Sequence, residues 1–451
     1  MRNHGFSKDM LAAGFGEHSL EAPLGASMPG YFADRKATAT LDPLMAKVLY
    51  LQLGSVRGAF VSVDLVGLEA PEADACRAAV SKRTGIPAAH VWIHATHTHT
   101  GTMIPRRFTS DTEAILGKSM RIGEADAGWL AQFPDRVADA VEAAVKAAKP
   151  GPAKLAETSV EGLAFYRRFT VKDGTVRTNP GRNNPEVVGP AGHADPTLTL
   201  LGFPESRTLL AIFGLHPDTV SGTGYSADYP AHMANAVREG LGADWNLVFL
   251  NAACGNINHI NVHDPKQLGG PAEATRIGKA LGEATVAAWA KAKPIEVDRL
   301  AFASRTVPSR LRTVPEADVK EAERVLKEEP GKAMPFNGFH AASAKVLGRT
   351  AEREQNAEIS VARIGPVGLA AMPGEVFVEL ARQIQHDSPF EPTRLINLTN
   401  GLLGYIPHAD AYKEGGYESG YLSARFEPRT GHRWAEAAIA LLKQLAQGGG
   451  A

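Results

Sequence analysis

Short apolar runs recur along the chain, and each ends in a glycine, a proline or a polar side chain. They are five to eight residues long and show little alternation between apolar and polar positions. Such runs are typical of strands buried on both faces, as in parallel or mixed sheets. The clearest of them lie at residues 59–64, 91–97, 209–216, 246–251, 367–372 and 395–399.

Stretches with the apolar spacing of helices lie between these runs, at residues 71–82, 126–148, 272–291, 316–329, 376–387 and 432–447. Strands that alternate with helices predict an α/β protein with mixed, largely parallel sheets and flanking helices. In this class the active site is expected at the carboxyl ends of the strands. Because no clean linker is visible, we expect one domain over residues 1–445, with a helical insertion at about 305–355 and a flexible tail at 446–451.

Composition narrows the possible partners. The 451 residues include 48 Lys+Arg and 49 Asp+Glu, a net charge of −1, which gives no reason to expect nucleic acid as a partner. Two cysteines, Cys76 and Cys254, exclude a disulfide framework and a Cys-rich metal site. No apolar stretch is long enough to cross a membrane, and the start lacks the apolar region of a secretion signal. We therefore expect a cytoplasmic protein.

Polar side chains that could bind a metal or take part in catalysis follow several of the predicted strands. They are Asp64, His97 with His99, His216, the loop at residues 251–258, Glu375 and Tyr405. Imidazoles, a carboxylate and a phenol are all ligands for first-row metals. The carboxyl ends of these strands are therefore a candidate metal site.

The segment from His94 to Gly101 carries the strongest signal. In an extended chain His97 and His99 share a face with the apolar residues before them, whereas His94 points the other way and is expected to be structural. Such a His-x-His pair suits a metal, although two hydrogen-bonded histidines at a strand end would look the same. Arg106 and Arg107 follow, either to select an anionic substrate group or as a solvated loop pair.

His216 and Glu375 extend this candidate site. Two imidazoles plus one carboxylate form a known catalytic zinc set that leaves a position open for water. Each residue also has an ordinary alternative, His216 as a hydrogen-bonded strand end and Glu375 as an acid at a helix N-terminus. Asp64 and Asp228 are candidates to orient the histidines from behind.

The loop after residue 251 is polar and rich in small residues. Cys254 is better explained as a small buried residue than as a nucleophile. Asn256 and Asn258 either donate amide hydrogens to a developing oxyanion or satisfy loop carbonyls. No phosphate-binding glycine loop follows a strand.

In combination, these motifs resemble the neutral/alkaline (non-lysosomal) ceramidase family. The run at 96–101 is similar to that family's Thr-His-Thr-His-Ser-Gly, and Tyr166-Arg167-Arg168 is similar to its Asn-Arg pair. Further matching segments lie in the same order at residues 23–31, 63–67, 213–216, 373–375, 404–406 and 416–418. The chain resembles a short bacterial-type member that has the catalytic domain only, without the family's immunoglobulin-like C-terminal domain.

The resemblance implies roles for individual residues. His97, His216, Glu375 and Tyr405 would be the ligands of a Zn²⁺ ion. His99 would sit beside the reacting water or the substrate, and Tyr417 and Arg167 would hold the scissile carbonyl region. Asn258 stands where the family has a serine, so an acyl-enzyme at this position is not available, while a hydrogen bond to the substrate carbonyl is.

The leading hypothesis is therefore a ceramidase-like, zinc-dependent hydrolase of a linear amide bond, with a role in lipid metabolism. A small acyl-amide or acyl-ester molecule is the expected partner, and the departures from the family weaken ceramide as that substrate. Two alternatives stay open: a zinc-dependent esterase or lactonase, and an inactive protein that binds a small molecule or a metal.

Overall fold

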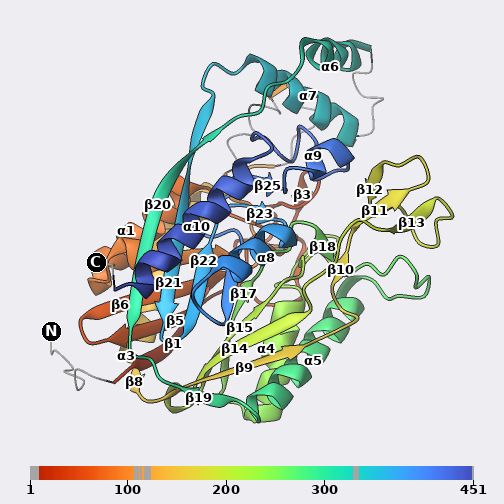
Figure 1. Cartoon of the computed structure of the whole chain (residues 1–451). Coiled ribbons are helices and arrows are strands. Elements are labelled where there is room, and N and C mark those ends of the chain that lie inside the picture. The colour runs from red at the N-terminus through yellow and green to blue at the C-terminus, as the bar shows by residue number, and fades with distance from the viewer. Residues whose placement is uncertain (1–9, 106–110, 112–113, 116–122, 329–334, 449–451) are drawn as a thin grey trace.

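Three large β-sheets form the centre of the molecule (Figure 1), a computed structural model that describes residues 10–105, 111, 114–115, 123–328 and 335–448. The first sheet has the order β7-β6-β5-β1-β8, with β1 at Ala12–Ser19, β5 at Met45–Leu53, β6 at Val56–Val63, β7 at Val91–Ala95 and β8 at Lys149–Pro150. The second has the order β17-β15-β14-β9-β19, with β9 at Ala153–Ser159, β14 at Thr197–Phe203, β15 at Thr208–Phe213, β17 at Asn246–Asn251 and β19 at Lys293–Ile295. The third has the order β20-β21-β22-β24, with β20 at Leu300–Arg310, β21 at Glu354–Ile364, β22 at Val367–Ala371 and β24 at Thr393–Ile396.

Short strand pairs complete the described sheet structure. They join β2 (Ser27–Met28) to β3 (Arg35–Lys36), β4 (Ala39–Thr40) to β16 (Gly224–Tyr225), β10 (Phe165–Tyr166) to β18 (Ile257–Asn258), and β23 (Glu375–Val376) to β25 (Tyr405–Ile406). A separate three-stranded sheet has the order β12-β11-β13, with β11 at Arg168–Val171, β12 at Val176–Thr178 and β13 at Val187–Pro190.

The six strands expected from the apolar runs are all present, and they are the strands that pair in parallel. In each large sheet they form one parallel pair at an edge: β6 with β7, β15 with β17, and β22 with β24. The other pairings of these sheets are antiparallel, so the sheets are mixed but less parallel than the runs indicate. A strand that is buried on both faces has the same continuous apolar sequence whichever way its neighbour runs.

Helices cover the outer faces of the sheets, as expected for an α/β protein. The helices are α1 (Ala70–Thr84), α3 (Ala127–Lys146), α4 (Tyr229–Leu241), α5 (Gly270–Trp289), α6 (Glu316–Glu328), α7 (Pro335–Arg349), α8 (Val378–Asp387), α9 (Ala411–Glu414) and α10 (Thr430–Ala446). The first sheet packs against α1 and α3, the second against α4 and α5, and the third against α8 and α10. Helix α4 was not among the predicted helices.

The inner faces of the three sheets share one apolar core. It contains Phe60, Trp92, Leu210, Val248, Phe302 and Leu369, all buried. Since each sheet buries one face here and the other under helices, its strands are apolar on both sides, which explains the runs seen in the sequence.

Two polar side chains tie the parallel edges together. The buried His94 ring lies between the other two sheets, with Nδ1 2.8 Å from the Asn397 carbonyl and Nε2 3.0 Å from the backbone nitrogen of Asn251. The Asn251 amide donates to the carbonyls of Thr96 and Leu215. His94 is therefore structural, as predicted, and the carboxyl ends of the parallel strands are held at one place.

Helices α6 and α7 connect β20 to β21 and lie at one end of the molecule (Figure 1). They fall within the stretch at about 305–355, whose outermost residues belong to those two strands. The tail expected at 446–451 begins with the last residue of α10, and residues 449–451 lie outside the described residues. None of the described helices has the length and apolarity needed to cross a lipid bilayer.

Asp64, at the end of β6, gives a stability prediction. Burial raises the pKa of this carboxyl from 3.8 to about 6, although Lys47 and hydrogen bonds from Met45 and Thr96 oppose the rise. The folded state thus favours the protonated acid. The stability that neutral Asp64 contributes is complete below pH about 4 and is lost as pH rises through about 6. We expect Asp64→Asn to raise the free energy of unfolding by about 2–3 kcal/mol at pH 8.

Urea unfolding at pH 4.5 and pH 8 checks this prediction. The amide introduced by Asp64→Asn can still accept the Met45 N–H and can donate to Thr96, so the gain should be complete at pH 8 and fall to about a third of that value at pH 4.5. An equal change at both pH values would show that the charge on Asp64 is not its cause.

Candidate metal centre

His97 lies in the turn that leaves β7. The strand ends at Ala95, two residues earlier than predicted, and His97 has a left-handed backbone with φ of 79°. Its backbone N–H donates to the Leu65 carbonyl at 2.9 Å, and its Nδ1 donates to the Val66 carbonyl. Both carbonyls follow β6, so the parallel neighbour positions the ring. Strand alternation therefore does not explain the place of His97.

His99 and His216 are held in the same manner. The Nδ1 atom of His99 lies 3.2 Å from the Gly30 carbonyl, and that of His216 lies 3.0 Å from the Cys254 carbonyl. A carbonyl oxygen only accepts, so the hydrogen of each neutral ring is on Nδ1 and its Nε2 carries a lone pair. Backbone carbonyls thus do the orienting that we expected of Asp64 and Asp228.

The Nε2 atoms of the three rings converge. The distance from His97 Nε2 to His216 Nε2 is 2.9 Å, and to His99 Nε2 it is 3.4 Å. With Nδ1 protonated in every ring, these contacts are not ordinary hydrogen bonds, because each Nε2 only accepts. Lone pairs that face one another in a buried site favour a cation between them. The three histidines can therefore hold a metal ion.

Glu375 brings a carboxylate to the same point. It begins β23, and its backbone pairs with Tyr405 at the start of β25. Its Oε2 atom is 3.3 Å from the Nε2 atoms of both His97 and His216, yet among the described residues this buried oxygen accepts no hydrogen bond. A buried oxygen without a partner is costly, and a metal ion would satisfy it.

The protonation states also suit a metal. Burial lowers the pKa of His216, and Arg167 and His97 add to the shift. Burial lowers the pKa of His99 to about 3, with a further contribution from His97. Neutral imidazoles and an ionised carboxylate are the forms that bind metal.

Tyr405 completes the group of four residues assigned as ligands from the sequence. Its hydroxyl oxygen is 3.5 Å from His216 Nε2 and accepts a hydrogen bond of 3.0 Å from Arg167 Nη2. Burial keeps the pKa of this phenol well above its usual value, although Arg167 opposes the shift. The structure thus brings His97, His99, His216, Glu375 and Tyr405 together from the ends of all three large sheets.

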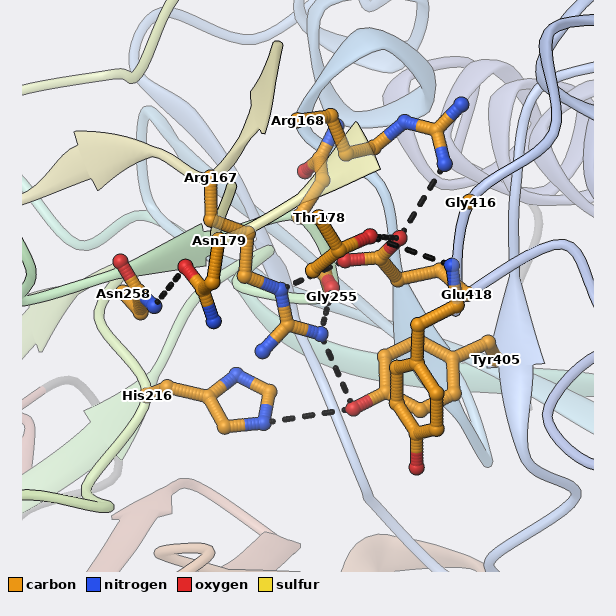
Figure 2. A network of polar contacts seen from close by, with 12 residues as sticks. Arg167, Arg168, Thr178, Asn179, His216, Gly255, Asn258, Tyr405, Gly416 and Glu418 are labelled. Atoms are coloured by element: carbon orange, nitrogen blue, oxygen red, sulfur yellow. Dashed lines mark hydrogen bonds and ion pairs between the residues drawn. The ribbon is translucent and has the colours of Figure 1, made fainter. Parts of the chain in front are cut away.

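A buried ionic network lies behind Tyr405 (Figure 2). Glu418 accepts from Arg167 Nε at 2.7 Å, from Arg168 Nη1 at 3.1 Å and from Thr178 Oγ1 at 2.6 Å. Arg167 also donates through Nη2 to the Gly255 carbonyl at 2.8 Å. Because Glu418 and the two arginines are all buried, the network fixes the Arg167 guanidinium beside the site.

Tyr417 and Asn258, two further residues assigned roles from the sequence, have different surroundings. The Tyr417 ring is half-buried and packs edge-on against the Tyr405 ring, with 5.5 Å between centroids. Asn258 is buried, and its Nδ2 donates to Asn179 Oδ1 at 2.8 Å. One Asn258 hydrogen is therefore used within the protein, and Asn179 lies between Asn258 and the Arg167 guanidinium (Figure 2).

Some polar residues of this region were not singled out from the sequence. Glu418 was part of a matching motif but had no assigned role, and Asn179 gave no signal. Asp218 and His259 form a pair near His216, with 3.1 Å between Asp218 Oδ1 and His259 Nδ1. The only sequence signal for this pair was its proximity to His216 and Asn258. Arg106 and Arg107 lie outside the described residues.

Two other candidates have structural surroundings. Cys254 is a free buried thiol whose pKa is raised to about 12 by burial, which favours the unreactive thiol form. The Asn256 side chain accepts from the backbone of Val378 and donates to Glu379, which leaves it inside the fold.

Comparison with known proteins places this architecture. No known family model matches the sequence, and no curated protein matches it at a significant level. Among solved structures, neutral ceramidase from Pseudomonas aeruginosa superimposes with a TM-score of 0.74 over 98% of this chain and 75% of that one, at 15% identity. A ceramidase complexed with C2 gives a TM-score of 0.73 over 98% and 76%, at 16% identity. This chain has a neutral ceramidase-like fold.

The neutral ceramidase-like fold confirms the resemblance found in the sequence. The similarity extends over almost the whole chain, although fewer than one residue in six is identical. At this identity the comparison establishes the fold alone, so the chemistry of this ceramidase-like chain must be argued from its own side chains.

Proposed function

We propose that this protein is a zinc-dependent hydrolase that cleaves a linear acyl-amide bond. The observation that carries the proposal is the convergence of the His97 and His216 Nε2 lone pairs on an unpartnered oxygen of Glu375. The neutral ceramidase-like fold supports it, because the similar solved structures are of enzymes named for hydrolysing ceramide, an amide.

His97, His216, Glu375 and Tyr405 would hold the ion. Nitrogen and oxygen donors in this combination suit Zn²⁺, and the backbone carbonyls behind the imidazoles keep the ligating nitrogens aimed inward. Zinc in such a donor set polarises a substrate carbonyl and makes hydroxide available near neutral pH. The chain's own residues would do the rest.

His99 is the candidate for proton transfer. Its Nε2 accepts rather than donates, its side chain is the least buried of the three imidazoles, and its backbone is fixed by the Pro217 carbonyl. It would take the proton from the attacking water and return it to the leaving amine.

Arg167 is the candidate for binding the scissile carbonyl. Glu418, Gly255 and Tyr405 hold its Nε and Nη2 atoms, so the guanidinium needs little reorganisation when charge develops on the substrate oxygen. Tyr417, packed against Tyr405, would place its hydroxyl beside the same oxygen. Asn258, which is buried and donates to Asn179, would act at this oxygen through that residue.

The experiment is metal reconstitution followed by a substrate panel. The purified wild type is stripped with a chelator, reloaded with Zn²⁺ and assayed on N-acyl amides of increasing chain length, a short-chain ceramide and the matched esters. We expect about one zinc per chain by mass spectrometry, and hydrolysis that disappears on stripping and returns on reloading.

The possible outcomes discriminate among the hypotheses. Amide turnover supports the proposal, and turnover of esters alone would replace it with an esterase. Zinc-loaded protein that is inert on the whole panel would identify a binding protein. Wild type that takes up no zinc would overturn the metal site itself.

A further inference from the structure

A chain of hydrogen bonds fixes the orientation of two asparagine amides beside the metal centre. The backbone N–H of Ile260 donates to Asn258 Oδ1 at 3.1 Å, and Asn258 Nδ2 donates to Asn179 Oδ1 at 2.8 Å. A backbone nitrogen can only donate, which identifies the oxygen of Asn258 and therefore that of Asn179. Among the residues that the structure describes, the Asn179 Nδ2 group has no acceptor, so it forms the donating end of this chain.

The backbone of Asn179 is held in place on both sides. Its N–H donates to the Arg167 carbonyl at 2.8 Å, and the preceding Thr178 donates to Glu418. Asn179 has φ of 46°, a left-handed conformation that asparagine tolerates better than most residues. Asn179 is an exposed residue, whereas Asn258 behind it is buried.

A second donor faces the same side. Figure 2 shows the Asn179 amide nitrogen on the side of the Arg167 guanidinium and the His216 ring. The Nε and Nη2 atoms of Arg167 are engaged, whereas among the described residues no partner is seen for Nη1. Two N–H groups with separate supporting contacts thus lie on the His216 side of the network.

We propose that Asn179 is a substrate-binding residue whose Nδ2 group, together with Arg167 Nη1, donates to an oxygen of the acyl group. Asn258 is then a positioning residue: it determines that Asn179 presents a donor and not an acceptor. This inference rests on the proposed hydrolase function. It also gives a reason for a buried amide at position 258, since a serine there would not impose the same direction on Asn179.

Three substitutions test the proposal. Asn258→Asp keeps the acceptor for Ile260 but loses the donor, so the Asn179 amide turns over and presents oxygen to the substrate. Asn179→Ala removes the donor directly. Asn183→Gly is the matched control, because Asn183 is exposed, is left-handed with φ of 51° and lies four residues away.

We expect kcat/KM to fall about 10–100-fold in both Asn258→Asp and Asn179→Ala, with zinc content unchanged, and to stay at the wild-type level in Asn183→Gly. Loss of a donor to the developing oxyanion lowers kcat, whereas loss of a donor to the ground-state oxygen raises KM. Because Asn179 is exposed, we expect Asn179→Ala to keep the fold even if a buried aspartate at position 258 does not. Wild-type kinetics in Asn179→Ala would overturn the inference while leaving the hydrolase proposal intact.

A binding measurement separates this inference from the proposed function. Octanoate, an acyl carboxylate, is titrated calorimetrically into the zinc-loaded wild type and the same variants. Binding weakened about tenfold or more by Asn179→Ala and by Asn258→Asp would support the donor role even in a protein that hydrolyses nothing. Equal affinity in all variants, or no binding to the wild type, would overturn it.

Discussion

Replacing both His97 and His216 by alanine is expected to reduce the zinc content from about one ion per chain to below about 0.1. The rate of hydrolysis should fall by at least about 10³-fold. The two rings supply the closest pair of converging nitrogens, and without them Glu375, Tyr405 and the single imidazole of His99 leave too few donors for a tight site. Metal content by plasma mass spectrometry and turnover of the best panel substrate measure the two effects.

Stability adds an independent measurement to this test. Zinc should raise the thermal unfolding midpoint of the wild type, because it binds the folded state, and should not raise that of the double variant. The control is His386→Ala, since the His386 side chain is 87% exposed and should leave zinc content and turnover unchanged. A double variant that retains stoichiometric zinc would show that the ion binds elsewhere.

Replacing Glu418 by glutamine is expected to destabilise the protein by about 3–5 kcal/mol. This carboxylate is fully buried and neutralises two buried guanidinium groups, those of Arg167 and Arg168. The arginines hold the pKa of Glu418 below its usual value even though burial works in the opposite direction. Glutamine preserves the shape but leaves the buried Arg167 without its carboxylate partner, while Arg168 keeps its ion pair with Glu414.

Equilibrium unfolding in guanidinium chloride at pH 7 measures this loss of stability. Turnover should fall as well, because the Arg167 guanidinium loses the contact that fixes its Nε atom. The matched control is Glu321→Gln, which removes a carboxylate that pairs with Arg324 on the exposed surface of α6 and should leave the unfolding midpoint unchanged. Similar stability of the Glu418 and Glu321 variants would show that the buried network contributes little.

The sequence was most informative where burial left a strong signature. The six apolar runs identified the strands that form the parallel pairs, because these strands are covered on both faces. The His97 and His216 candidates were found for the same reason, since polar residues at the end of an apolar run are conspicuous. Helix α4 was missed although it carries apolar residues on one face, since the Asp228 and Pro230 signals for its start were not used.

Other features could not be obtained from local patterns. The strand of His97 was predicted two residues too long because a left-handed residue after Thr96 has no signal in apolar spacing. The partners of the histidine rings were expected to be Asp64 and Asp228. They are main-chain carbonyls, which every residue carries and no side-chain pattern reveals.

By itself, the sequence determined the α/β class, the strands of the parallel pairs, the candidate ligands and, through its motifs, the similarity to the neutral ceramidases. Only the tertiary structure decided that the three parallel edges meet, that Glu418 unites Arg167 and Arg168, and that Asn258 acts on Asn179. The physical reason is the separation along the sequence of the residues that interact. Burial and local conformation are written in neighbouring residues, whereas the direction of a hydrogen bond or the pairing of buried charges depends on side chains tens to hundreds of positions apart.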